Sequence, residues 1–327
     1  MTRPAKSFPA ALTLFFTAPL VAEFLLGDLS LKLLPALIVL APTYGGAALL
    51  IREFVRRSGR GWPSILLLGA AYALLGEGFI TQSLFNPDYL RLHLHFLDHG
   101  WIPALGIGAW WTLFMLNLHA FWSVGVSIAL VEGLFPNRAE GAWLGPIGES
   151  VVAILFLLGS LAMRRYTLRT EHFNASHAQA AGTAALCLLL IAVAFLLPRV
   201  RASAGELPAP SAWLMGAAAL LLGMAVLMIP PVWNWGAAAV MLAIDVCFLL
   251  SVGWLSHSHG WTGLHTLSLG AGGALAYGIH AFFQPPLNTG SRALGLAGNA
   301  VFLSLALVVI VAGVKRTSSA VRYRVFS

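Results

Sequence analysis

The feature that most constrains this chain is a series of long apolar runs that follow one another along its whole length. A helix needs about 20 predominantly apolar residues to cross the roughly 30 Å hydrocarbon core of a bilayer. The polar stretches between the runs are too short to form a separate soluble domain. We therefore predict an all-α polytopic integral membrane protein, a single membrane domain over residues 1–327 with about ten transmembrane helices. The expected spans are residues 9–27, 31–51, 63–85, 105–134, 147–163, 179–198, 211–230, 234–255, 263–284 and 294–314.

The composition excludes a water-soluble fold. Hydrophobic residues make up 59% of the chain and charged residues only 9%, whereas a soluble domain has about 25% charged residues. The net charge of +7 does not indicate nucleic-acid binding, because the basic residues lie in short clusters at the ends of apolar runs, where they anchor helices. The expected partners are therefore the lipid bilayer and an unknown small molecule or ion, and not nucleic acid.

The distribution of Lys and Arg predicts the orientation of the helices. With both termini in the cytoplasm, most basic residues fall on the cytoplasmic side, as the positive-inside rule requires. The cluster "RRYTLR", residues 164–169, is an exception on the outer side. The abundance of Ala, Gly and Leu, with Arg far above Lys, favours a bacterial chain. We therefore expect a multi-pass protein of the cytoplasmic (inner) membrane.

An internal repeat is indicated by pairs of similar segments that keep their order along the chain. "LNLHAFWS", residues 116–123, resembles "YGIHAFFQ", residues 277–284, and "LGPIGESV" at 144–151 resembles "LGLAGNAV" at 294–301. The predicted repeat units are residues 9–170 and 179–320, with five spans each. An odd number of spans gives the two units opposite orientations, which is the 5+5 inverted repeat of many secondary transporters.

Four ionisable residues inside the spans are the strongest functional candidates. They are Glu77, His119, Asp245 and His280. Charged residues at the centre of a span commonly cost about 2.5–3.5 kcal/mol, so they usually mark a functional site. Under the repeat, Glu77 corresponds to Asp245 and His119 to His280. We predict a cluster near the midplane that relays protons or binds a metal.

In the metal hypothesis, the ligands are His119, His280, Glu77 and Asp245. Carboxylate and imidazole groups suit a divalent ion such as zinc, iron or manganese. The cofactor is otherwise unknown. The alternative is two separate carboxylate–histidine hydrogen bonds that hold neighbouring helices together.

Several further residues belong to the predicted pathway or to irregular helices. Asn117 and Ser123 flank His119 and are expected to line the same proton or substrate pathway. Glu23 is another carboxylate within a span, although the second half has no acidic residue at the matching place. "APTYGG", residues 41–46, places Pro42 and a pair of glycines inside the second span. This predicts either a broken helix of the transporter type or an ordinary proline kink.

One short motif resembles an enzyme family in part. "GEGFIT", residues 76–81, resembles the Glu-Glu-x-x-x-Arg motif of intramembrane CAAX-type proteases, with Glu77 kept and Thr81 in place of the arginine. His119 would be the histidine of their Phe-x-x-x-His motif, with Met115 in place of the phenylalanine. The resemblance is limited to these residues. It implies a metal-dependent intramembrane hydrolase in which Glu77 and His119 are catalytic.

The sequence thus leaves three functions open. We favour a transporter or permease with a carboxylate–histidine site near the midplane, which would allow coupling to protons, because of the ten spans, the repeat and the paired ionisable residues. The intramembrane hydrolase is the enzymatic alternative. A structural membrane protein without catalysis is the third.

Overall fold

The predicted all-α membrane architecture is confirmed by the computed structural model, which describes residues 7–199, 205–284 and 291–326. A helix occupies each of the ten predicted spans. Eight are long and apolar enough to cross a membrane: Phe8–Leu25, Leu31–Arg57, Trp62–Ile80, Ala109–Leu134, Pro146–Thr170, His177–Leu196, Trp235–Leu255 and Arg292–Val321. The other two are a 17-residue apolar helix, Ala212–Met228, and an 18-residue helix rich in glycine, Gly263–His280.

The first four spans change their helical winding along their length. The first consists of α1 (Phe8–Pro19) and η1 (Leu20–Leu25), and the third of α4 (Trp62–Leu74) and η4 (Leu75–Ile80). The second contains η2 (Leu31–Ala36), α2 (Leu37–Leu40), η3 (Ala41–Gly45) and α3 (Gly46–Arg57). The fourth contains α5 (Ala109–Asn117), η7 (Leu118–Val126) and α6 (Ser127–Leu134). The segments η1, η3, η4 and η7 are π-helical. At Pro42 the second span therefore continues as a π turn, and the predicted break of the helix is not found.

The later spans are regular α-helices joined by short elements. They are α7 (Pro146–Thr170), α8 (His177–Leu196), α9 (Ala212–Met228), α10 (Trp235–Leu255), α11 (Gly263–His280) and α12 (Arg292–Phe326). Short 3-10 turns are η5 (Tyr89–Arg91), η6 (Phe96–Asp98), η8 (Pro136–Arg138) and η9 (Pro231–Trp233). The strands β1 (Trp101–Ile102) and β2 (Ile107–Gly108) form an antiparallel pair, and β3 (Gly205–Pro208) runs parallel to β4 (Ser258–His259).

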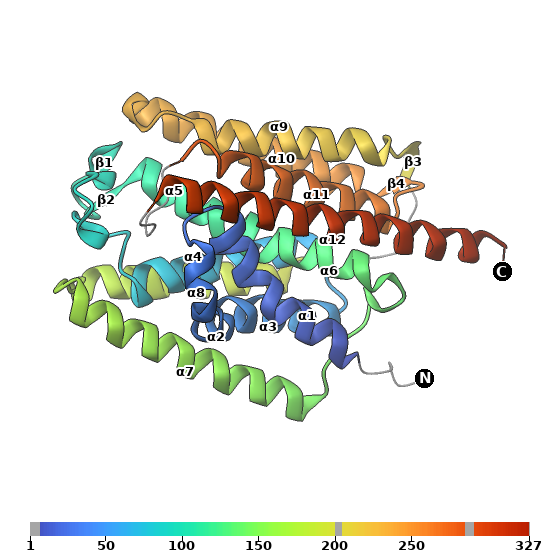
Figure 1. Ribbon diagram of the computed structural model, residues 1–327, viewed down its shortest axis with the longest axis horizontal. Coiled ribbons are helices and arrows are strands. Elements are labelled where there is room, and N and C mark those ends of the chain that lie inside the picture. Colours follow the sequence, from blue (N-terminus) through green and yellow to red (C-terminus); the bar gives the residue numbers. More distant parts are fainter. Residues whose placement is uncertain (1–6, 200–204, 285–290, 327) are drawn as a thin grey trace.

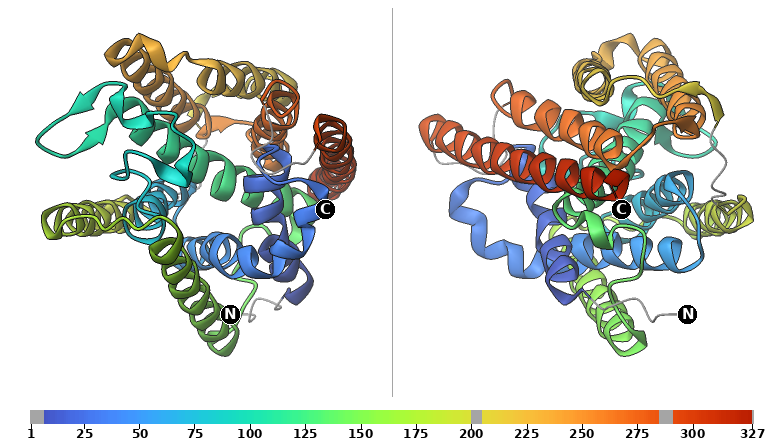
Figure 2. Two further views of the ribbon diagram at one scale, coloured as in Figure 1. Left: turned by 60° about the vertical axis from the view of Figure 1, so that its left-hand side comes forward. Right: turned by 90° about the vertical axis from the view of Figure 1, so that its right-hand side faces the viewer.

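The fourth span lies at the centre of the bundle, and α7 lies at its edge (Figures 1 and 2). In the most apolar stretch of Ala109–Leu134, 78% of the residues are buried, whereas the corresponding shares are 6% in α7 and 11% in α8 and α10. Those three helices expose large apolar side chains such as Ile154, Leu188 and Leu250. These apolar surfaces are suited to contact lipid, because lipid chains are themselves apolar.

The start of α1 and the end of α12 lie at the same end of the bundle, and the hairpin of β1 and β2 lies at the opposite end (Figure 1). An even number of spans places the two termini at the same end of the bundle, and a loop after the third span lies at the opposite end. The cluster at residues 164–169 forms the last turns of α7. Placement of the termini in the cytoplasm stays a prediction.

Helix α11 packs closely on α9 because both carry glycine where they cross. A Cβ atom built on Gly272 would lie 2.1 Å from the backbone oxygen of Gly216 and 2.8 Å from the nitrogen of Leu220. No side chain fits there without separating the two helices, so small residues at this crossing let the backbones approach.

We expect Gly272→Ala to destabilise the fold by about 1–3 kcal/mol, because the added methyl group overpacks the crossing of α9 and α11. The measurement is SDS-driven unfolding in mixed micelles. Gly253→Ala in α10 is the matched control, because a Cβ there meets nothing within 4 Å and alanine is the better helix former. Equal stability of the two variants would contradict the tight crossing.

Candidate functional site

Glu77 and His119 are brought into direct contact between the third and fourth spans. The Nε2 atom of His119 lies 2.8 Å from Oε1 of Glu77. The two residues are only 6% and 7% exposed, so the pair is shielded from solvent by the bundle. Of the four ionisable residues that the sequence singled out, these two are the ones in contact.

The second oxygen of the Glu77 carboxylate is held by hydroxyl groups just beyond the end of η4. Its Oε2 atom accepts hydrogen bonds from Thr81 Oγ1, at 2.8 Å, and from Ser83 Oγ. The carboxylate is therefore met by three polar groups, as a buried charge requires. Gly78, next to Glu77, lets α8 approach, because a Cβ there would lie 2.6 Å from Cγ2 of Thr183.

A second carboxylate and two tyrosines complete the cluster. The Tyr44 hydroxyl donates a hydrogen bond to Oε1 of Glu23. The ring of Tyr44 stacks on His119 with centroids 5.9 Å apart, and Tyr72 contacts the same imidazole edge-on at 5.5 Å. Glu23 also lies within electrostatic reach of both His119 and Glu77.

Four members of this cluster lie on π-helical segments, whereas Tyr72 lies in α4. Glu23 lies in η1, Tyr44 in η3, Glu77 in η4 and His119 in η7, and these are the π-helical segments among the described residues. A π turn inserts an extra residue into a helix, is rare, and occurs frequently at functional sites. Four such turns converge on one cluster, which marks it as the candidate site.

Nδ1 of His119 has no hydrogen-bond partner, although the atom is buried. When Nε2 donates to Glu77, Nδ1 is a free acceptor inside the bundle. When the ring is doubly protonated, Nδ1 is a free donor. The imidazole therefore has one ring nitrogen without a protein partner while its bond to Glu77 is kept.

The other predicted pathway residues lie elsewhere. Asn117 Nδ2 donates to Oδ2 of Asp245 at 2.9 Å, where α5 contacts α10. Ser123 donates to the carbonyl of Leu118 at 3.1 Å and so contributes to the π turn itself. His280 is the last residue of α11, half-buried, and its Nδ1 has no partner.

The metal hypothesis and the repeat stay predictions. Across residues 7–199, 205–284 and 291–326, no three side chains of the His, Cys, Asp or Glu type come close enough together to hold a metal ion. The expected equivalence of the two halves is not visible at this site, because Glu77 bonds to His119 whereas Asp245 bonds to Asn117.

Sequence reasoning underestimated Glu23 and did not find Tyr44 or Tyr72. Glu23 is detectable as a carboxylate within a span, but the predicted repeat has no acidic residue at the corresponding position of its second unit. Tyr44 was detectable only through the break at Pro42. No signal in the sequence indicated that Tyr72 faces His119.

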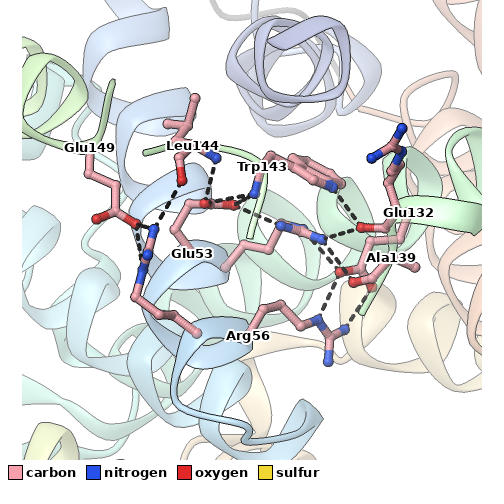
Figure 3. A network of polar contacts seen from close by, with 10 residues as sticks. Glu53, Arg56, Glu132, Ala139, Trp143, Leu144 and Glu149 are labelled. Carbon is pink, nitrogen blue, oxygen red and sulfur yellow. Dashed lines mark hydrogen bonds and ion pairs between the residues drawn. The ribbon is translucent and has the colours of Figure 1, made fainter. Parts of the chain in front are cut away.

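A second buried polar network lies where the ends of α3 and α6 meet the start of α7 (Figure 3). Arg52 is fully buried and bonds to Glu53 at 2.7 Å and to Glu132 at 3.0 Å. Arg56 bonds to the other oxygen of Glu132 at 2.7 Å. The Arg52 guanidinium also lies 3.3 Å from the ring centroid of Trp143. Positive and negative charges balance here.

The loop before α7 is held by the same network. The carboxylate of Glu53 accepts hydrogen bonds from the backbone nitrogens of Trp143 and Leu144, each at 2.9 Å. Arg52 donates to the carbonyl of Ala139 at 2.8 Å. Every charge has its partner, so we interpret this network as a structural tie between the second span, the fourth span and α7.

The fold and these buried polar clusters define a multi-pass helical membrane protein. Residues 12–323 match the model of an uncharacterized membrane protein family, and the chain belongs to this family. No curated protein matches the chain, and no solved structure does.

We expect Arg52→Met to destabilise the protein by about 3–5 kcal/mol, because it leaves the Glu53 and Glu132 carboxylates buried with less opposite charge. Arg57→Met is the matched control: its salt bridge to Glu149 is partly exposed, at 44% for the arginine side chain, and such pairs contribute below about 1 kcal/mol. SDS-driven unfolding measures both variants. Similar losses would refute the structural role of Arg52.

Proposed function

We propose that the protein is a transporter or permease in which the Glu77–His119 pair carries a proton, coupled to movement of a small solute or ion. The observation that supports this most is the 2.8 Å contact between the two side chains, placed on π turns and beside a second carboxylate, Glu23. Ionisable groups that face one another inside a helix bundle are the usual elements of proton relays in transporters.

The charge of the cluster supports proton binding. Two carboxylates, Glu23 and Glu77, act on the single imidazole of His119. If both carboxylates are ionised, the formal charge is −2 with a neutral imidazole and −1 with an imidazolium ion. An unbalanced charge is expensive in a low-dielectric interior, so the cluster favours uptake of a proton. The free Nδ1 of His119 is one place to receive it.

A polar route leads from Glu77 to the end of the bundle that carries the β1–β2 hairpin. Thr81 and Ser83, which bond to Glu77, lie after the end of η4. The Tyr89 side chain lies beside Thr81. Burial, together with the charges of Glu77 and Glu23, raises the pKa of the Tyr89 hydroxyl well above its ordinary value. Tyr89 therefore keeps its proton and can donate a hydrogen bond in a relay.

The π turns supply a means for the proton to change the structure. Hydrogen bonds in a π turn join residues five apart instead of four apart, so the extra residue can shift along the helix. A change of charge at His119 or Glu77 alters the balance between two windings of η7 and η4. A transporter needs a bistable element of this kind to alternate its access.

We expect Glu77→Gln to reduce proton uptake to the level of empty liposomes, because the amide cannot become a charged partner of His119. The measurement is an entrapped pH dye in proteoliposomes under an imposed membrane potential. Infrared difference spectra recorded on a pH change should lose a carboxyl band in the same variant. Glu149→Gln, at the exposed pair with Arg57, is the control. If the Glu77→Gln variant takes up protons at the wild-type rate and its infrared spectrum is unchanged, Glu77 is not the proton carrier.

An intramembrane hydrolase is the second candidate, favoured by the free Nδ1 of a histidine that is bonded to a glutamate. Glu77 would activate a water molecule, and His119 would bind a metal. This function requires near-stoichiometric zinc, iron or manganese in purified protein and its loss in His119→Ala. The proton carrier predicts the same low metal content in both samples, and elemental mass spectrometry distinguishes the two functions.

A further inference from the structure

The second His-Ala-aromatic motif ends at a junction of two helix C-termini. The turn after η1 contains Gly27 in the left-handed region, with φ +92°, and a Cβ there would lie 2.9 Å from Cβ of Ala281. Gln284, which follows α11, donates hydrogen bonds to the carbonyl of Leu26 at 2.6 Å and to Oδ1 of Asp28 at 3.0 Å. The end of the first span and the end of α11 are thereby fixed together.

Negative charge accumulates at this junction. The C-terminal end of a helix carries partial negative charge on its free carbonyl groups, and η1 and α11 both end here. Asp28 adds a full carboxylate. Its described electrostatic neighbours are Glu23, which is also negative, and the neutral amide of Gln284. Burial and then Glu23 raise the pKa of Asp28 to about 7, against the hydrogen bond from Gln284, which lowers it.

Two buried hydroxyl groups have no hydrogen-bond partner: that of Tyr277, and that of Ser30, which follows Asp28 by two residues along the chain. Tyr277 is 0% exposed and Ser30 is 3% exposed, and the oxygen of each side chain is unpaired. Tyr277 lies within electrostatic reach of both Asp28 and Glu23. A buried hydroxyl without a partner costs about 1–3 kcal/mol. The ring of Tyr277 is held in place by stacking on Trp122, with centroids 4.6 Å apart.

We propose that this junction is a binding site for a hard monovalent cation of the sodium type, held by Asp28, by the Tyr277 and Ser30 hydroxyls and by Glu23. Hard cations take oxygen ligands, and in transporters helix C-termini and unwound carbonyls coordinate sodium or protons. The two carboxylates and the neutral hydroxyl oxygens bring no positive charge of their own, so the site favours a cation. The inference deepens the proposed function, since Glu23 is shared with the Glu77–His119 pair.

Sharing of Glu23 makes the two sites compete. A cation beside Asp28 stabilises ionised Glu23, whereas a proton delivered through His119 reduces the negative charge that holds the cation. Coupling of this kind is reciprocal, so a proton weakens cation binding by the same factor by which the cation weakens proton binding. This is the linkage required for exchange of a cation against a proton.

The test is thermal unfolding of the purified full-length protein in detergent, with sodium chloride replacing choline chloride at constant ionic strength. We expect sodium to raise the unfolding temperature of the wild type, because a ligand that binds only the folded state stabilises it. Asp28→Asn and Tyr277→Phe should lose this shift. The Tyr277 hydroxyl makes no hydrogen bond, so Tyr277→Phe is expected to fold normally. Tyr166→Phe, at an exposed tyrosine of α7, is the control.

Two results would overturn the cation site. One is an equal response of the wild type to sodium and choline, which would mean that a proton neutralises Asp28. The other is an undiminished sodium shift in Tyr277→Phe and Asp28→Asn. Glu77→Gln separates this inference from the proposed function, because that variant lacks the proton carrier but keeps the cation ligands. A sodium shift retained in Glu77→Gln supports the site whatever the outcome of the proton-uptake assay.

Discussion

A charge carried into a helix bundle has to be met by donors or by opposite charge, because neither lipid nor protein interior replaces the lost water. The protein meets this constraint to three different degrees. Around Arg52, every carboxylate has its arginine and the loop before α7 is fixed. At Glu77 the carboxylate is satisfied, but one nitrogen of His119 is free. At Asp28 the negative charge has no described positive neighbour.

The degree of charge compensation distinguishes the structural network around Arg52 from the two proposed binding sites. A fully balanced network has nothing to gain from a ligand, and removal of one partner is costly. A site that lacks one proton or one cation has a free-energy reason to bind it. The two proposed sites, at His119 and at Asp28, both lie within electrostatic reach of Glu23. We therefore propose that they act together. The proposed proton and the proposed cation would each supply the positive charge that these carboxylates lack.

The helix winding and the two related motifs place these groups. Four spans include π turns, each carrying one member of the central cluster. The motifs around His119 and His280 meet in space, since Trp122 of the first stacks on Tyr277 of the second and donates to the carbonyl of Gly273 at 2.8 Å. Their histidines nevertheless have different surroundings, so similarity of sequence did not produce equivalent sites here.

The class of protein, and the places where polar residues enter the spans, follow from the sequence alone. Length and hydropathy are local properties, so ten apolar runs were enough to predict ten helices, and Glu77 and His119 were detectable because ionisable residues are expensive at that depth. The partners of these polar side chains depend on how the helices pack. Rotation, tilt and the π turns bring Glu23 and Tyr44 to His119 and direct Asp245 to Asn117. Gln284 meets Asp28, although 256 residues separate them. A partner depends on which faces of distant helices meet, and no local pattern contains that geometry.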